Sequence, residues 1–239
     1  MRKLAFVPTT TLKPYKDNIN LYHLEKFFVK AGFTFIPLEN KPSIFEAYAE
    51  AVKEHVSDED VVVFCHDDIE ILSNVAAFNA ALKPLEGPKR LGFLGIAGTK
   101  SFDKSGMWWN GTGRMPLGHP DHPLSGQVFT GSSTGDMYST MYGKYGVVTI
   151  LDGVFLAAQG KTLKGLRLEK PKSFPGNWDY YDIYYTHQTY KKNLENRTVP
   201  IVLRHDSPGE MKRGWYQNRD VFLEVLEKSD RLPIRLPYC

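Results

Sequence analysis

Apolar and polar residues alternate in blocks over the first hundred positions of the chain. Short apolar runs with the length and composition of buried strands occur at four places: 3–7, 33–38, 60–65 and 91–97. Apolar residues at helical spacing occupy the three intervals between them: 17–31, 43–56 and 74–82. Strands that alternate with helices predict a sheet with helices on both faces. We therefore expect an α/β fold whose central sheet is mainly parallel.

The regular pattern stops near Gly98. Residues 100–146 contain nine glycines together with Trp108 and Trp109, and we expect one long loop there. Long irregular segments inside a compact domain usually have a function. Downstream, the pattern predicts four elements: a strand over 147–158 interrupted at Asp152-Gly153, a helix over 179–192, a strand over 199–205 and a helix over 217–228. Because neither a linker nor a repeat divides the chain, we expect one domain over residues 1–239.

The composition excludes several protein classes. The 239 residues are 42% hydrophobic and 24% charged, which rules out a disordered chain, a coiled coil and a collagen-like repeat. No apolar stretch approaches the roughly 20 residues of a membrane span, and the first residues are too short an apolar run for a signal peptide. The two cysteines, Cys65 and Cys239, indicate no disulfide framework. We expect a cytoplasmic protein with no integral membrane association.

The net charge of +3 is unevenly distributed. Residues 1–160 hold 15 basic and 17 acidic residues, whereas residues 161–219 hold 12 and 6. This basic segment is either a solvated surface or a binding surface for an anionic partner. Five of its basic side chains could grip a diphosphate, an anionic glycan or a nucleic acid backbone: Lys161, Lys164, Arg167, Lys170 and Lys172.

The segment VVVFCHDDIEI, residues 61–71, contains the most informative polar cluster. Its apolar run predicts a strand buried on both faces, which ends in His66, Asp67 and Asp68. Open α/β sheets bind ligands at the carboxyl ends of their strands. Carboxylate oxygens suit Mg²⁺ or Mn²⁺, particularly when substrate phosphates complete the shell. The alternative is a surface turn with an incidental acidic pair.

Six motifs occur in order along about residues 3–210: SIFEAYAEAV, VVVFCHDDIEI, LGFLGIAGT, LDGVFLAA, WDYYDIYYTHQTY and VLRHDSPG. Together they resemble the GT-A glycosyltransferases, specifically the family 2-like branch related to the StrF domain of streptomycin biosynthesis. The chain departs from the family pattern at Ala49, where the family usually has Asn. The resemblance implies a single Rossmann-like GT-A domain, in which residues 1–99 bind a nucleotide sugar and residues 100–239 bind the acceptor.

The resemblance also implies a metal-dependent, inverting glycosyltransferase, either a hexosyl- or a pentosyltransferase. A divalent metal would stabilise the diphosphate leaving group of the donor. Asp67 and Asp68 resemble the family's DxD-type metal and ribose site, with Asp68 as the direct metal ligand. His205 resembles the histidine that completes the metal shell, and its nitrogen would favour Mn²⁺ over Mg²⁺. A purely structural histidine is the alternative.

Further residues resemble the substrate-binding elements of the family. Pro8, Thr9 and Thr10 after the first strand, and Glu39 after the second, resemble the nucleoside pocket, although ordinary strand ends have the same composition. Asp152 resembles the sugar- or acceptor-binding element, with a turn aspartate as the alternative.

Inversion needs one base to deprotonate the acceptor hydroxyl. Asp179 and Asp182 lie three residues apart and share a helix face near its N-terminus. By resemblance, Asp182 occupies the position of the base, and Asp179 is the second candidate. Either residue could instead be a helix-capping carboxylate, Asp179 in particular, since it sits where an N-cap is expected.

The acceptor stays open between a glycan, a protein side chain and a hydroxymethylated base in DNA. Trp108, Trp109 and Trp178 could stack on sugar rings or on bases, or belong to the core. Two other function classes compete. His66-Asp67 resembles the HD pair of metal-dependent phosphohydrolases, and a non-catalytic nucleotide- or sugar-binding module would keep the acidic pair without needing Asp182.

Overall fold

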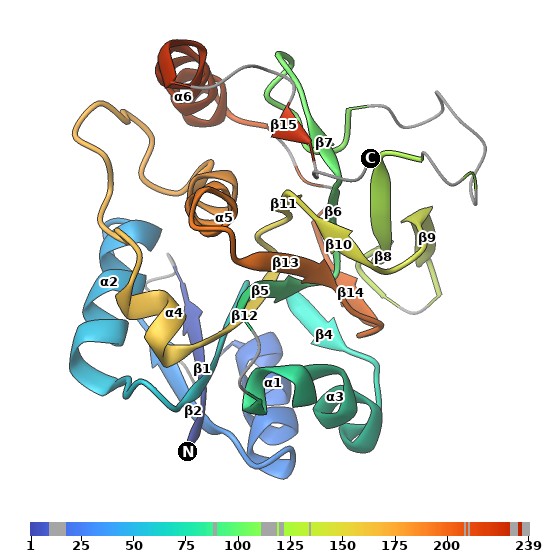
Figure 1. Cartoon of the computed structure of the whole chain (residues 1–239). Coiled ribbons are helices and arrows are strands. Elements are labelled where there is room, and N and C mark those ends of the chain that lie inside the picture. Colours follow the sequence, from blue (N-terminus) through green and yellow to red (C-terminus); the bar gives the residue numbers. More distant parts are fainter. Residues whose placement is uncertain are drawn as a thin grey trace.

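A computed structural model gives the fold of the chain (Figure 1). It describes residues 1–9, 18–87, 90–110, 119, 122–133, 135–207, 209, 211–229 and 234–235. The helices are α1 (Ile19–Lys30), α2 (Ile44–His55), α3 (Val75–Leu82), α4 (Gly160–Lys164), α5 (Tyr181–Lys191) and α6 (Arg213–Ser229), with a 3₁₀ turn η2 at Lys83–Glu86. Among the described residues, no helix combines the length and apolar composition needed to cross a membrane.

The central sheet has seven strands in the order β10-β13-β5-β12-β3-β1-β2. Their bounds are β1 Lys3–Pro8, β2 Thr34–Leu38, β3 Val61–Cys65, β5 Leu91–Gly95, β10 Val147–Val148, β12 Phe155–Gln159 and β13 Glu195–Thr198. β12 runs antiparallel to both of its neighbours, β3 and β5, and β10 runs antiparallel to β13. The other strands run in one direction, so the expected α/β fold with a mainly parallel central sheet is confirmed.

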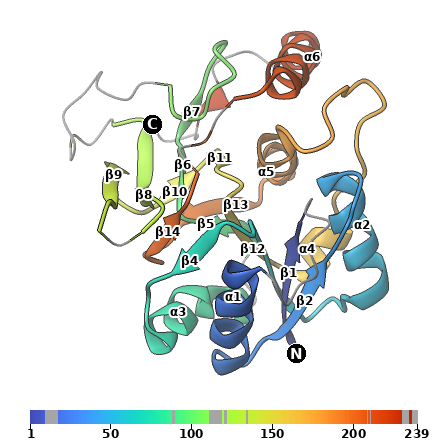
Figure 2. The same ribbon diagram turned by 180° about the vertical axis from the view of Figure 1, so that it is seen from behind.

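A second sheet stands beside the first, with the strand order β11-β6-β8-β14-β4 and β9 added on β8. Its strands are β4 Ile69–Ile71, β6 Ala97–Thr99, β8 Leu124–Thr130, β9 Tyr138–Gly143, β11 Ile150–Leu151 and β14 Leu203–His205. A small pair joins β7 (Ser101–Phe102) to β15 (Ile234–Arg235). Figure 2 shows this second sheet on the side away from α2 and α4.

The expectation of one long loop over 100–146 is wrong where β7, β8 and β9 form. Two of the glycines there, Gly126 and Gly143, allow close approach of neighbouring backbone. Gly126 in β8 has φ +97°, and a Cβ at this position would lie 1.9 Å from the carbonyl oxygen of Ile96. The glycine in β8 therefore reflects tight strand packing.

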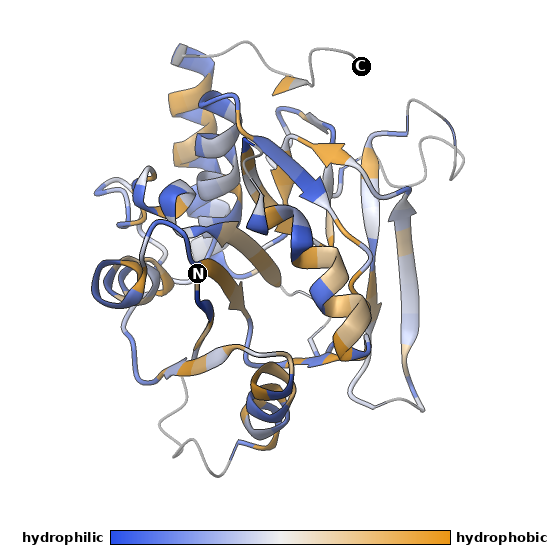
Figure 3. Ribbon diagram, turned by 60° about the horizontal axis from the view of Figure 1, so that its bottom comes forward, coloured by the Kyte–Doolittle hydropathy of each residue, from blue (hydrophilic) through white to orange (hydrophobic). Residues whose placement is uncertain are grey.

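Helices cover both faces of the central sheet. α2, α4 and α5 pack on one face, while α1 and α3 lie together on the other (Figures 1 and 2). The hydropathy colouring of Figure 3 shows mixed apolar and polar bands along the helices, as amphipathic packing requires. The Ser43 side chain caps α2 by accepting from the backbone of Phe45, so the predicted helix start is confirmed.

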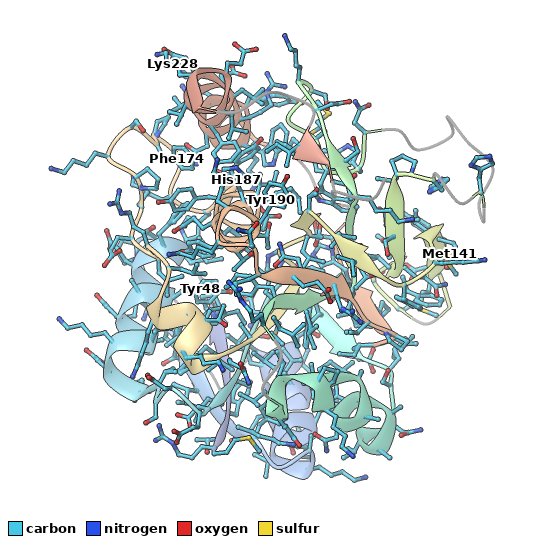
Figure 4. All side chains as sticks on the ribbon, in the orientation of Figure 1. Tyr48, Met141, Phe174, His187, Tyr190 and Lys228 are labelled. Atoms are coloured by element: carbon cyan, nitrogen blue, oxygen red, sulfur yellow. The ribbon has the colours of Figure 1, made fainter. Side chains whose placement is uncertain are left out.

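Aromatic side chains fill the space between helices and sheet. Tyr48 of α2 stacks on Phe64 of β3 with ring centroids 3.9 Å apart. Phe174, which is labelled in Figure 4, lies in the connection between α4 and α5. It packs against Phe45 and Tyr184. One contiguous core of buried residues extends from the first strand to the last.

Three predicted elements of the second half differ in detail. The strand expected over 199–205 forms only at Leu203–His205, which is β14 of the second sheet. The preceding strand, β13, pairs in the central sheet, and Pro200 lies in the connection between the two strands because proline cannot donate a ladder hydrogen bond. The strand expected over 147–158 splits into β10, β11 and β12, with the interruption at Asp152-Gly153 as predicted. The last helix begins at Arg213, earlier than expected.

The chain passes between the two sheets at several points. β3 leads into β4 through residues 66–68, and β11 leads into β12 through residues 152–154. β13 leads into β14 in the same way. These crossings position the polar residues described next.

Candidate functional site

A pocket with a volume of about 370 Å³ opens where the crossing segments meet. Its lining is acidic and aromatic, and it includes all four tryptophans of the chain. The chemistry-bearing residues around it are His66, Asp152, Asp179, Asp182 and His205. The sequence predicted four of these five as site residues, and the fold brings them to one cavity.

Strand pairing brings His205 to Asp68. β14 runs antiparallel to β4 with His205 opposite Ile69, and the backbone N–H of Asp206 donates to the carbonyl oxygen of Asp68 at 2.9 Å. Nε2 of His205 then lies 3.3 Å from Oδ1 of Asp68, and Nδ1 of His66 lies 3.7 Å from the same oxygen. The predicted pair, Asp68 and His205, is thus joined by a third residue, His66.

Tyr181 fixes the tautomer of His66. The Tyr181 hydroxyl donates to the carbonyl oxygen of Gly153 at 2.8 Å, which uses its one proton. Nε2 of His66 lies 2.8 Å from the same hydroxyl oxygen, so this nitrogen carries the proton and donates. Nδ1 of His66 is therefore left with a lone pair that faces Asp68.

The charges in this cluster compensate one another. Burial would lower the pKa of His205, but the hydrogen bond and the charge of Asp68 outweigh burial and raise it. Burial would raise the pKa of Asp68, yet His205 lowers it. Burial lowers the pKa of His66, and Asp68 opposes this shift. Asp68 thus favours a positive charge beside it.

The three side chains fit a divalent metal ion. Their ligand atoms lie within 4.8 Å of one another, as one carboxylate oxygen and two imidazole nitrogens. Oδ1 of Asp68 is inaccessible to solvent, and ring nitrogens of both histidines approach it, so that a cation bound there would be shared by all three side chains. A mixed nitrogen and oxygen donor set suits Mn²⁺ better than Mg²⁺.

Two of the residues expected around the nucleoside, Thr9 and Asp67, are in contact. The Thr9 side chain hydrogen-bonds to Asp67, and the Thr9 N–H donates to the carbonyl oxygen of Leu38 at 3.1 Å. Burial raises the pKa of Asp67, and the Thr9 bond opposes this shift. Pro8 is buried beside Thr9, and Glu39 is exposed directly after β2. Thr10 lies outside the described residues.

Asp182 faces the pocket from the first turn of α5. Its Oδ2 accepts from the backbone N–H of Gly153 at 3.0 Å. Burial and the nearby charge of Asp152 raise the pKa of Asp182 to about 7. A side chain at Gly153 would clash with Tyr181 and Asp182, which explains the glycine at this position. A carboxylate with this pKa can accept a proton near neutral pH.

Asp179 does not cap α5. The N-cap residue is Tyr180, which has φ +68° and makes no side-chain capping bond. The strained residue is held because its hydroxyl donates to the carbonyl oxygen of Gly106 at 2.9 Å, and Asn218 donates to the carbonyl oxygen of Asp179 at 2.9 Å. Asp179 instead lines the pocket, where burial raises its pKa and Lys212 opposes the rise.

The basic residues at 161–172 lie elsewhere. Lys164 forms an ion pair with Asp58 at 2.9 Å, and Lys170 donates to Oδ1 of Asn177 at 2.6 Å. None of the described lysines or arginines lines the pocket. The basic side chains of residues 161–172, which could bind an anionic partner, therefore do not line this pocket.

Sequence reasoning missed several residues of the site. His66 was visible directly before the acidic pair, but its position gave no sign that its ring faces His205. Tyr181, Asn218 and Trp215 were missed because their partners in the site lie far from them in sequence. Tyr181 contacts His66, Asn218 contacts Asp179 and Trp215 contacts Trp109.

Structural neighbours are distant. The crystal structure of A197 from STIV has a TM-score of 0.46 and 13% identity, covering 89% of this chain and 99% of its own. A protein from Bacillus anthracis described as a glucose-1-phosphate thymidylyltransferase, in complex with a sucrose, has a TM-score of 0.36 and 10% identity, covering 97% of this chain and 96% of its own. No curated protein matches the chain significantly.

The family comparison is more informative. The model of the glycosyltransferase-like family matches residues 16–229. This range includes the cluster of His66, Asp68 and His205 as well as Asp152 and Asp182. The chain therefore belongs to this glycosyltransferase-like family, as its motifs indicated.

Proposed function

We propose that the protein is a metal-dependent, inverting glycosyltransferase that moves a sugar from a nucleotide-sugar donor to a hydroxyl acceptor. The observation that carries the proposal is that His66 and His205, two members of the cluster with Asp68, line the same pocket as Asp182. A cation site and a base with a pKa near 7 are the two groups that this chemistry needs.

The donor would bind across the carboxyl ends of β1 and β3. Thr9 and Asp67 would hold the nucleoside, with Pro8, Thr10 and Glu39 around it, so that the diphosphate reaches Asp68. His66, Asp68 and His205 would hold the metal, Mn²⁺ in preference to Mg²⁺. When bound, the cation supplies charge stabilisation for the diphosphate that leaves. Residues 1–99 would thus provide most of the donor site.

The acceptor would bind among residues 100–239. Asp182 would take the proton of the acceptor hydroxyl while that oxygen attacks the anomeric carbon from the face opposite the diphosphate. One displacement of this kind inverts the configuration. Asp152 would raise the pKa of Asp182 and hold a sugar hydroxyl, and Asp179 would contact the acceptor. A StrF-related branch and a cytoplasmic location stay predictions of the sequence.

A donor-hydrolysis assay tests the proposal. The purified protein is incubated with Mn²⁺ and a panel of nucleotide sugars, and the released sugar is followed by NMR. We expect slow hydrolysis that a chelator stops, with the first-formed sugar in the inverted configuration. Nucleotide binding without any turnover would instead indicate a binding module, and phosphate release from simple phosphoesters would indicate a phosphohydrolase. Release of the retained anomer would contradict inversion.

A further inference from the structure

Four tryptophans gather around the pocket in two layers. Trp108 and Trp215 are buried, whereas Trp109 and Trp178 are half-exposed. Trp109 packs edge-on against Trp108 with ring centroids 5.6 Å apart, and its ring is tilted by 42° against that of Trp215 at 5.5 Å. The buried pair therefore supports the ring of Trp109, which lines the pocket.

The turn that carries Trp178 is held in place from both sides. The backbone N–H of Ile44 and the hydroxyl of Ser43 both donate to the carbonyl oxygen of Asn177, each at 3.1 Å. On the other side, Asn218 bonds Gly176 through its side-chain oxygen at 2.8 Å and through its amide nitrogen at 3.1 Å. A ring on such a turn is already ordered before a ligand binds, which lowers the entropic cost of binding.

The charges of the pocket oppose an anionic ligand on this aromatic surface. Asp152, Asp179 and Asp182 all line it, and the lysines and arginines that the structure describes do not. Lys212 acts on Asp179 from an exposed position outside the lining. Carboxylates accept hydrogen bonds from uncharged hydroxyl groups but repel phosphates and uronates.

We infer that the acceptor is a neutral carbohydrate, whose sugar ring stacks on Trp109 or Trp178 through its apolar C–H face. This inference rests on the proposed function. The hydroxyls of the ring would donate to Asp152 and Asp179, and the reacting hydroxyl would lie against Asp182. In the transfer step, this oxygen bonds to the anomeric carbon, the bond from that carbon to the diphosphate breaks, the electron pair leaves with the diphosphate, and the proton goes to Asp182.

Tryptophan fluorescence tests the inference directly, because every tryptophan of the chain lines this pocket. The full chain is titrated with cellotetraose, maltotetraose and laminaritetraose, with tetragalacturonic acid, and with a duplex DNA that contains hydroxymethylcytosine. We expect a saturable change with at least one neutral sugar, little dependent on salt, and none with the acidic sugar or the DNA. No response to any of the neutral sugars would overturn the inference. A response to DNA that falls steeply with salt would overturn it in favour of a nucleic acid acceptor.

Variants locate the binding. Trp109→Ala and Trp178→Ala should each weaken neutral-sugar binding about tenfold where their ring is the stacking surface. Trp109→Phe and Trp178→Phe should retain most of it and guard against loss of folding. Tyr22→Ala removes an exposed aromatic ring of α1 outside the pocket and serves as the matched control. Unchanged binding in both alanine variants would overturn the inference.

Hydrolysis of the nucleotide sugar in water distinguishes failure of the proposed glycosyltransferase activity from failure of the proposed carbohydrate acceptor. A chain that binds neutral sugars but hydrolyses no nucleotide sugar would contradict the proposed function and leave the carbohydrate site in place. A chain that hydrolyses the donor but responds to none of the neutral sugars would contradict the carbohydrate acceptor alone.

Discussion

Nε2 of His66 and the hydroxyl oxygen of Tyr181 lie 2.8 Å apart, and this contact joins the candidate metal site to the helix that carries the candidate base. Tyr181 immediately precedes Asp182, so one turn of α5 both orients a metal ligand and presents the carboxylate. The positions of the candidate metal ligand His66 and of the candidate base Asp182 therefore depend on the same turn of α5.

Removal of the Tyr181 hydroxyl should weaken the cation site. Tyr181→Phe frees Nε2 of His66 and allows the wrong tautomer, and we expect Mn²⁺ affinity to fall by about 10-fold or more. Isothermal titration of the folded protein with Mn²⁺ measures this. Tyr184→Phe, on the same helix but packed against Phe45 and Phe174, is the control and should bind Mn²⁺ as the wild type does. Equal affinity in the two variants would contradict the role of Tyr181.

Asp182→Asn should remove the base without disturbing the fold. The amide oxygen can still accept from the N–H of Gly153, so thermal unfolding should remain cooperative. We expect the transfer rate to fall by about 10²- to 10⁴-fold. Asp179→Asn should cost less, because Asp179 would only contact the acceptor. A variant of Asp182 with full activity would exclude this residue as the base.

The raised pKa of Asp182 predicts opposite effects of pH on activity and on stability. Activity should rise with pH through about 7, because the base must be ionised to accept a proton. Stability contributed by this group is present below about pH 4 and is lost as pH rises toward 7, since the folded state holds the proton more tightly than the unfolded chain. Asp182→Asn should therefore gain thermal stability relative to the wild type between pH 4 and 8. A constant difference in melting temperature would contradict the shift.

Two glycines with positive φ should respond differently to alanine. Gly32 has φ +86° and open space around it, so Gly32→Ala should cost only the backbone strain, about 1–2 kcal/mol. Gly126 has φ +97°, and a methyl group there would collide with Ile96, so Gly126→Ala should cost clearly more. Urea unfolding of both variants measures the difference. Similar costs would mean that β6 and β8 can move apart.

The sequence predicted the parts of the fold that depend on local pattern. The strands at β1, β2, β3 and β5 and the helices α1 to α3 follow from apolar periodicity and caps, which are local properties. β11 and β14 were expected within longer strands, but β8 and β9 were missed, because they are fixed by pairing with distant segments and not by a local apolar pattern. β12 was expected as a strand, but its antiparallel place between β3 and β5 has no local signature.

The residues of the candidate site divide in the same way, into those with a local sequence signature and those placed only by distant contacts. The sequence could place Asp67 and Asp68 after a strand and Asp182 near the start of a helix, because strand ends and helix starts are recognisable locally, whereas their roles come from the family resemblance. The ring of His66 could be placed only through Tyr181, which is 115 residues away. The basic segment was predicted as a possible binding surface from its composition alone. In the fold, Lys164 forms an ion pair with Asp58 and does not line the pocket.

The passage of the chain between the two sheets has a consequence for folding. The cluster needs β14 beside β4, a pairing that also joins Arg204 to Glu70 across 134 residues, so its ligands meet only after nearly the whole chain has assembled. An ion that binds there binds the complete native state and nothing less. The binding free energy of the proposed metal ion would then add to the unfolding free energy of the entire domain, so that adding the metal would raise the melting temperature of the protein.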